Sequence, residues 1–203
     1  MSCGRCCTCT HKFWHGSSVA AHVWCGDHNR VGQVASIGVG AKDVSSIDWI
    51  SDHVQLDWAM FACSITPYSH GNVAKKLLKK LGVQGVDVIN SAVFNGGFLT
   101  GGSFFDYREV KPETDPELFA WRDKFNAICA EFGVKPAAVC VQFSFLFPEI
   151  KSVALATSKP SRVAQNIELA NVVRSCRYRG RSRDLARASP LRTRTHGSQP
   201  VHA

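Results

Sequence analysis

The sequence contains no apolar run that approaches the roughly 18 residues needed to cross a membrane. Its first residues, MSCGRCCTCTHKFWHG, lack the apolar stretch of a secretory signal, so we expect a cytoplasmic protein with no membrane partner. A disulfide framework is not indicated either, because nine cysteines is an odd number. Cys63, Cys129 and Cys140 fall inside apolar segments, where cysteine behaves as a small hydrophobic residue.

Acidic residues are nearly absent from the end of the chain. Residues 173–203 carry eight arginines against the single Asp184, which accounts for +7 of the formal net charge of +8. The remainder of the protein is therefore close to neutral. The basic character belongs to this tail and does not indicate that the folded part binds nucleic acid.

The sequence divides into three parts. A chain of 203 residues with 45% hydrophobic content predicts one domain with tails. Residues 1–31 form an irregular leader rich in Cys and His, residues 32–172 are orderly, and residues 173–203 form an Arg/Ser-rich tail without periodicity. We predict that the tail is disordered.

The leader holds candidate zinc ligands. Cys3 and Cys6 have the two-residue gap of a zinc knuckle, and Cys9, His11 or His15 could complete the set. The second pair lacks knuckle spacing. We therefore predict a reduced, disordered leader and no metal site.

The orderly part alternates between strands and helices. Apolar segments predict strands at 33–40, 57–63, 86–94 and 150–156, and helical patterns follow them at 43–54, 72–82, 114–133, 136–146 and beyond 158. In the second helix we expect a buried side formed by Val73, Leu77, Leu78 and Leu81. Apolar strands without strict alternation, separated by helices, predict a parallel sheet covered by helices.

The segment SKPSRVAQN, residues 158–166, opens the last of these helices. Pro160 suits the first turn, since its missing N–H would have no partner there. Spacings of three and four residues place one cation and two amides on one face: Arg162, Gln165 and Asn166. An open helix N-terminus with these side chains suits a phosphorylated nucleotide, and an ordinary capped surface helix is the alternative on the local sequence alone.

Three segments together resemble the carboxy-terminal half of an aldo-keto reductase: IGVG, VINSAVFNGGFLTGG and SVALATSKPSRVAQNIELA. The resemblance covers roughly residues 32–172 and is nearest the L-galactose dehydrogenase and D-threo-aldose 1-dehydrogenase branch. It implies an α/β fold, a partial (β/α)8 TIM barrel of about four βα units that corresponds to strands five to eight of the family. In such barrels the functional groups sit at the C-terminal ends of the strands.

The resemblance also implies a nicotinamide dinucleotide, NADP or NAD, as cofactor. Arg162 would pair with the 2′-phosphate, Gln165 and Asn166 would hydrogen-bond the adenine, and the glycine-rich loop would wrap the pyrophosphate. The implied contacts are Asn95, Gly96, Gly97, Leu99, Thr157, Ser158, Lys159, Arg162, Gln165 and Asn166.

The family's catalytic Tyr, Lys, Asp and His come from the first half of the barrel, which the resemblance does not cover. The leader is too short to supply four βα units, since each needs about 30 residues. Tyr107 beside Asp106, and Tyr68 near His70, are the available alternatives. We assign none of them a catalytic role.

The resulting expectation is a truncated NAD(P)-dependent oxidoreductase of the aldo-keto reductase type, with a sugar or aldehyde substrate, inactive alone. We expect it to self-associate or to pair with a complementary barrel half. One alternative is a dinucleotide-binding or interaction module that regulates a full-length relative. Another is a nucleic-acid binder that acts through the basic tail.

Overall fold

The structure is a computed structural model that describes residues 6–10, 34–157 and 159–171. Ser158, the tail and most of the leader lie outside the described residues. The predictions of a disordered tail and of zinc ligands at Cys3, His11 or His15 therefore fall outside them too.

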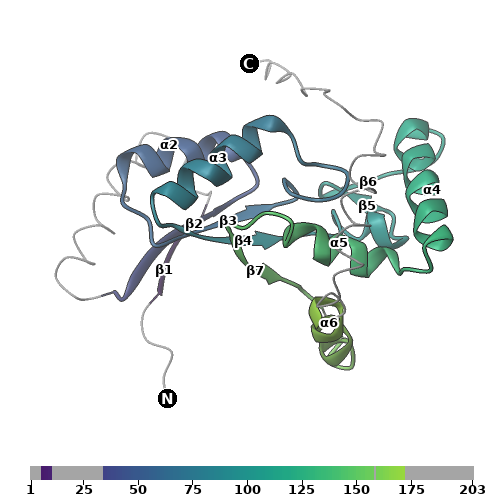
Figure 1. Ribbon diagram of the computed structural model, residues 1–203. Helices are drawn as coiled ribbons and strands as arrows, with labels where there is room; N and C mark the ends of the chain where they lie inside the picture. Colours follow the sequence, from purple (N-terminus) through teal and green to yellow (C-terminus); the bar gives the residue numbers. More distant parts are fainter. Residues whose placement is uncertain (1–5, 11–33, 158, 172–203) are drawn as a thin grey trace.

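The described residues form a sheet with helices inserted between its strands (Figure 1). The strands are β1 (Cys6–Thr10), β2 (Ser36–Ala41), β3 (Trp58–Ala62), β4 (Asp87–Ser91), β5 (Phe104–Phe105), β6 (Arg108–Glu109) and β7 (Ile150–Ala154). The helices are α2 (Val44–His53), α3 (Asn72–Val83), the 3-10 helix η2 (Phe98–Thr100), α4 (Pro116–Glu131), α5 (Pro136–Ser144) and α6 (Arg162–Asn171).

Five strands form a parallel sheet in the order β1-β2-β3-β4-β7, which confirms the predicted parallel sheet. β5 and β6 form a separate antiparallel hairpin. β1 was not expected, because the sequence predicts no regular element within residues 1–31. Its five residues pair with β2, from Cys6 beside Ser36 to Thr10 beside Gly40.

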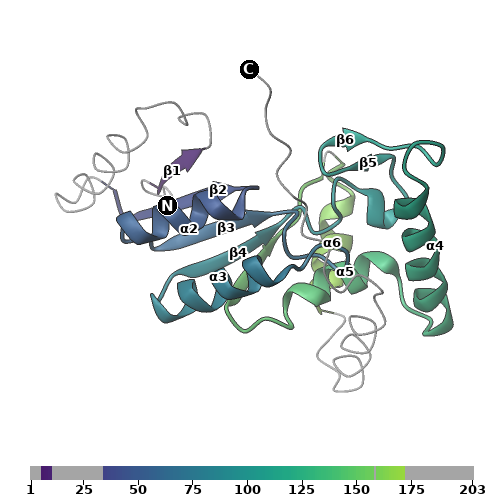
Figure 2. The ribbon, with the colours of Figure 1, turned by 90° about the horizontal axis from the view of Figure 1, so that it is seen from above.

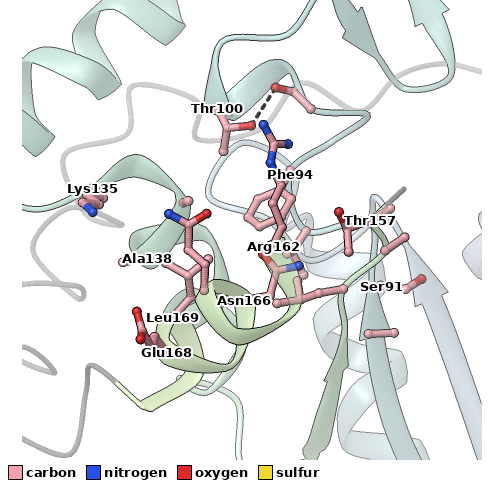
Figure 3. Close-up of a pocket in the computed structure, with 18 of the residues that line it drawn as sticks. Ser91, Phe94, Thr100, Lys135, Ala138, Thr157, Arg162, Asn166, Glu168 and Leu169 are labelled. Atoms are coloured by element: carbon pink, nitrogen blue, oxygen red, sulfur yellow. Dashed lines mark hydrogen bonds between the residues drawn. The ribbon is translucent and has the colours of Figure 1, made fainter. Parts of the chain in front are cut away.

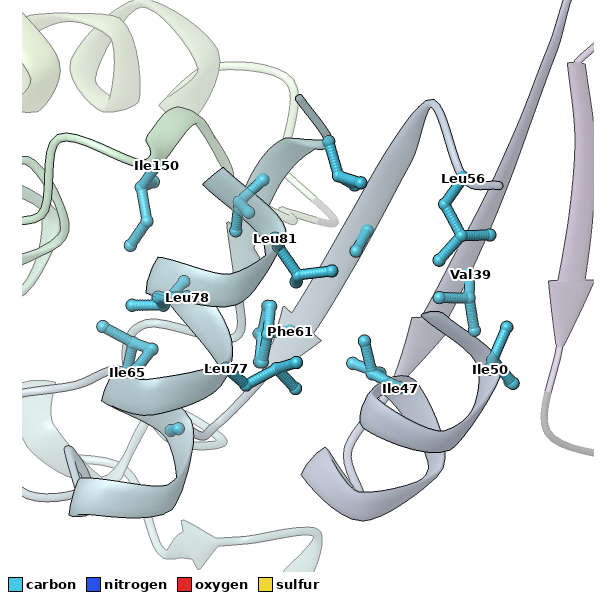
Figure 4. Packing of buried hydrophobic residues seen from close by; sticks show 14 of the residues in the cluster. Val39, Ile47, Ile50, Leu56, Phe61, Ile65, Leu77, Leu78, Leu81 and Ile150 are labelled. Atoms are coloured by element: carbon cyan, nitrogen blue, oxygen red, sulfur yellow. The ribbon is translucent and has the colours of Figure 1, made fainter. Parts of the chain in front are cut away.

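Helices α2 and α3 cover one face of this sheet (Figures 1 and 2). Asp43 caps α2 by accepting hydrogen bonds from the backbone N–H groups of Ser45 and Ser46, at 3.3 and 3.0 Å. Apolar side chains of both helices meet the inward residues of the strands in one core (Figure 4), which includes Val39, Ile47, Phe61, Leu77, Leu78 and Leu81.

The expected buried side of α3 was wrong at one position. Val73 is 65% exposed, and Ala74 is buried in its place with Leu77, Leu78 and Leu81. A helix turns by about 100° per residue, so Val73 lies well to one side of the buried stripe that runs from Ala74 to Leu81.

Alternate side chains of β3 and β4 point to the opposite face of the sheet, where Trp58, Met60 and Ile89 are only half-buried. The Trp58 ring lies directly against Gly38 of the neighbouring strand. A Cβ on Gly38 would fall 2.0 Å from this ring, so the indole occupies space that only glycine leaves free.

A long insertion separates β4 from its neighbour β7 and contains η2, the β5–β6 hairpin, α4 and α5. It has an aromatic core of its own, in which Phe98, Phe105, Phe119, Trp121 and Phe125 pack together. α4 lies at the end of the molecule opposite β1 (Figures 1 and 2).

Cys63, Cys129 and Cys140 are free and buried, as predicted. α6 begins at Arg162, two residues after the predicted first-turn position Pro160, which lies in a turn instead. No helix in the described ranges is long and apolar enough to cross a membrane.

Candidate functional site

The candidate site lies where the carboxyl ends of β4 and β7 meet. These strands are hydrogen-bonded neighbours, with Ser91 beside Ala154, although about 60 residues separate them in the chain. The glycine-rich loop that follows β4 and the segment that follows β7 therefore start side by side. Functional groups of parallel α/β proteins gather at this edge of the sheet.

A cavity of about 1080 Å³ opens between these segments (Figure 3). The loop after β4 contributes Gly96, Gly97 and Thr100, and the segment after β7 contributes Thr157, Arg162, Gln165 and Asn166. Ligand pockets usually measure about 300–1,000 Å³. The cavity is therefore large enough for a ligand bigger than a typical drug-sized molecule.

The glycines of the first wall are required by the backbone. Gly97 has a φ of +94°, and the position of a Cβ on it has no heavy atom within 4 Å, so its surface is open. Gly96 has a φ of +73°, and a Cβ there would lie 2.7 Å from the carbonyl oxygen of Phe104. Gly96 therefore lets the loop approach the β5–β6 hairpin closely, while Gly97 leaves room for a ligand.

The second wall presents hydrogen-bonding side chains from α6. Arg162 is the first residue of this ten-residue helix, and Asn166 follows one turn later on the same side. Figure 3 shows Arg162 reaching from α6 toward the loop that carries Thr100, whose hydroxyl donates to the carbonyl of Gly97 at 3.0 Å. Ahead of the helix, the Thr157 hydroxyl accepts a hydrogen bond from the Lys159 N–H at 3.1 Å. The arrangement suits an elongated anionic ligand.

Six of the residues predicted from the sequence line this cavity: Gly96, Gly97, Thr157, Arg162, Gln165 and Asn166. Asn95, Leu99 and Lys159 are not part of its wall, and Ser158 lies outside the described residues. Asn95 is fully buried, and its side-chain oxygen accepts the Asp106 N–H at 3.2 Å. Asn95 therefore supports the loop from its buried side, away from the cavity. Leu99 is fully buried in the aromatic core.

A third wall was not predicted. It consists of Gly133, Val134, Lys135, Ala137, Ala138, Glu168 and Leu169. These residues come together because α5 packs against α6 through Ala138, Val141 and Leu169. The sequence shows two helices there but carries no signal that they touch.

Tyr107 lines the cavity together with Ser91 and Ala92. Its hydroxyl neighbours the Cys63 thiol, and the Lys42 ammonium lies over its ring at 5.9 Å from the centroid. Burial raises the pKa of Tyr107, and the neighbouring Cys63 and Asp106 add to this effect. Burial likewise raises the pKa of the Cys63 thiol to about 11. Both groups are therefore protonated at neutral pH.

Tyr68 and His70, which we assigned no catalytic role, make packing contacts. Tyr68 packs edge-on against Phe105 and Trp121, at 5.1 and 5.0 Å between ring centroids. The His70 ring packs against Phe143, and burial lowers its pKa. Within the described ranges, no three His, Cys, Asp or Glu side chains are arranged to hold a metal ion.

Comparisons with known proteins point in one direction. The sequence pattern described as "Aldo/keto reductase family" matches residues 25–175. Pyridoxal 4-dehydrogenase from Microbacterium luteolum is 24% identical over 140 residues, which are 67% of this chain and 40% of that protein.

Solved structures agree on the fold. Aldo-keto reductase AKR11C1 from Bacillus halodurans, in its apo form, superposes with a TM-score of 0.66 at 12% identity, over 89% of this chain and 61% of that one. The glycerol dehydrogenase AKR11B4 from Gluconobacter oxydans gives a TM-score of 0.65 at 12% identity, over 97% and 62%. The chain thus spans less than two thirds of the length of each of these proteins.

Proposed function

Because this chain belongs to the aldo/keto reductase family, we propose that the cavity between β4 and β7 binds a nicotinamide dinucleotide. The observation that carries the proposal is the convergence of Arg162, Gln165 and Asn166 with the open glycine loop on one cavity of about 1080 Å³. That volume and these donors fit a long ligand with phosphate groups along it.

The adenosine end of the ligand is assigned to α6. Arg162 offers a planar pair of N–H donors to the 2′-phosphate, and Gln165 and Asn166 offer amide groups to the adenine edge. The segment of Thr157, Ser158 and Lys159 would approach the 2′-phosphate or the ribose. A cation at this position favours NADP over NAD, which lacks the 2′-phosphate.

The pyrophosphate is assigned to the loop after β4. Gly97 leaves its backbone open, so N–H groups of the loop can approach phosphate oxygens without a side chain between them. Asn95, Gly96 and Leu99 support this loop through their own packing. The dinucleotide would supply a hydride when bound, and the residues of this chain hold and orient it.

The finer parts of the assignment are also proposals. We infer that β2, β3, β4 and β7 correspond to strands five to eight of a (β/α)8 barrel in the L-galactose dehydrogenase-like branch. The sugar or aldehyde substrate and the proton-transferring residues would then belong to the other half of that barrel. On this proposal the chain alone binds NADP without turning over aldoses or aldehydes, which absorbance of NADPH in the presence of such substrates can check.

Calorimetric titration with NADP and NAD tests the proposal. A partly desolvated charge-assisted pair contributes about 1.5–3 kcal/mol, and each 1.4 kcal/mol is a factor of ten. Arg162→Ala should therefore weaken NADP binding by roughly ten- to a hundredfold and leave NAD binding within about twofold. If Lys159 also pairs with the 2′-phosphate, the loss of NADP affinity in Arg162→Ala should be nearer to about tenfold.

Lys151→Ala is the matched control, because Lys151 is an exposed cation of β7 that lies outside the cavity wall. It should leave both affinities unchanged. Equal losses for the two cofactors in Arg162→Ala would show that Arg162 supports the fold. Absence of any binding by the wild type would overturn the proposal.

A further inference from the structure

The glycine loop after β4 folds back on itself around one backbone carbonyl. The Gly97 oxygen accepts the Thr100 N–H at 3.1 Å, the Thr100 hydroxyl at 3.0 Å and the Gly102 N–H at 2.9 Å. A Cβ on Gly102 would lie 2.9 Å from the same oxygen, so the two ends of the loop are in close contact. Gly97, Gly101 and Gly102 lose more conformational freedom on folding than other residues would. Contacts from outside the loop are therefore needed to hold it in one conformation.

Arg122 of α4 supplies such contacts at both ends of the loop. Its Nη1 group donates to the Gly102 carbonyl at 3.1 Å. Its guanidinium carbon lies 4.4 Å from the centroid of the Phe98 ring and 4.5 Å from that of Phe119. A cation within about 6 Å of an aromatic ring is attracted to it. Phe98 follows Gly97 and is fully buried, and Phe119 lies one helical turn before Arg122. One side chain thus joins the start and the end of the loop to α4.

Arg122 makes these contacts from outside the cavity. It is not among the described residues that line the cavity, whereas Gly97 and Thr100, which belong to the loop it contacts, both line it. The planar guanidinium suits this task because it can pack on aromatic rings and still donate a directional hydrogen bond. A loop that is held in place before its ligand arrives need not be ordered during binding, which strengthens binding.

We propose that Arg122 is a positioning residue that holds the glycine loop in the conformation that receives the pyrophosphate. The inference rests on the proposed function, which assigns the pyrophosphate to this loop. It extends the site to α4, which contributes no residue to the cavity wall in the described part of the chain. Loss of Arg122 should release the loop and leave α6, where the adenosine is assigned, unchanged.

Hydrogen exchange of the ligand-free chain tests the release of the loop directly. In Arg122→Met, the amides of Thr100, Gly101 and Gly102 should exchange roughly three- to tenfold faster than in the wild type, because their hydrogen bonds open more often. The amides of α2 and α3 should keep their rates. Excess NADP should restore slow exchange in the loop. Lys124→Met, which removes an exposed cation from the same helix, is the matched control and should change none of these rates.

Calorimetric titration of the same variants tests the consequence for binding. Arg122→Met should bind NADP roughly three- to tenfold more weakly, because the released loop must be ordered during binding. Adenosine 2′-monophosphate lacks the pyrophosphate, so its affinity should stay within about twofold of the wild type. Arg122→Lys keeps the charge but lacks the planar donor group, and it should lose at least about twofold in NADP affinity.

Each result supports the positioning role or overturns it. Unchanged loop exchange or unchanged NADP affinity in Arg122→Met overturns it, as does wild-type NADP affinity in Arg122→Lys. Equal losses for NADP and adenosine 2′-monophosphate, or faster exchange throughout α2 and α3, would make Arg122 a residue of the fold alone. If Arg122→Met does not fold, the same measurements on Arg122→Lys decide the matter. A wild-type chain that binds neither ligand overturns the dinucleotide function, and the role of Arg122 with it.

Discussion

Cys63 directly follows β3 and has a φ of 59°, in the left-handed region that side chains with a Cβ rarely adopt. Replacing it with either Gly or Ala removes the same thiol and the same contact with Tyr107. Only glycine also relieves the strain of the positive φ at this position. We expect Cys63→Gly to be about 1 kcal/mol more stable than Cys63→Ala in urea denaturation. Equal stability of the two variants would show that the backbone there is unstrained.

For single residues, the sequence predicts which side chains share a helix face, but it does not predict left-handed backbone conformations. Arg162, Gln165 and Asn166 were predicted to share a face, because helical geometry follows directly from positions three and four apart. Cys63 and Tyr107 gave no such signal. Left-handed conformations are expected at glycine. The segment FFDYRE contains no glycine, so its tight turn, with φ angles of 52° and 67° at the two central residues, could not be predicted from the sequence.

Elements were predicted where one physical cause dominated. The strand at 57–63 and the helix at 72–82 follow from apolar runs and periodicity, and the structure forms β3 and α3 there. β1 was missed because the alternation of Cys and Thr in CCTCT spans only four residues, within a leader that has no other periodicity. Contacts between elements were missed as well: the α5–α6 packing that builds one wall of the cavity depends on tertiary structure.

The junction of β6 with α4 offers a test by pH. Asp115 precedes α4 and accepts hydrogen bonds from Arg108 and from the Thr114 hydroxyl. The Arg108 guanidinium above all lowers the pKa of Asp115 to about 2. Because the folded state holds this proton less tightly than the unfolded state, the stabilisation is present above about pH 4 and is lost as the pH falls toward 2.

We therefore expect Asp115→Asn to be less stable than the wild type in urea denaturation at pH 7. The difference should shrink steadily between about pH 4 and pH 2. Asp123→Asn removes an exposed carboxylate from the middle of the same helix and serves as the control. If the difference in stability between the wild type and Asp115→Asn stayed constant across this pH range, the pairing of Asp115 with Arg108 would be contradicted.

For the molecule as a whole, the sheet presents two unequal faces. Helices α2 and α3 bury one face, while Trp58, Met60 and Ile89 on the other are only half-buried among the described residues. β1 and β7 each pair with a single strand of this sheet in the described part of the chain. Open strand edges and an exposed apolar face both favour association with another chain.

We expect the 203-residue chain to form dimers or larger species at micromolar concentration, as measured by light scattering. Met60→Lys should reduce the association by placing a charge on the half-buried face. Val83→Lys, at a residue of α3 that is already 89% exposed, should not. A monodisperse wild-type monomer with a sharp cooperative melt would argue against this expectation.

The Gly38–Trp58 contact has a consequence for how the sequence can vary. The indole of one strand fills the space that a side chain on the neighbouring strand would need, with only 2.0 Å between the ring and a Cβ at Gly38. The two positions can therefore change only together. Among relatives, a larger residue at the site of Gly38 should coincide with a small one at the site of Trp58, and the two should be inherited as a pair.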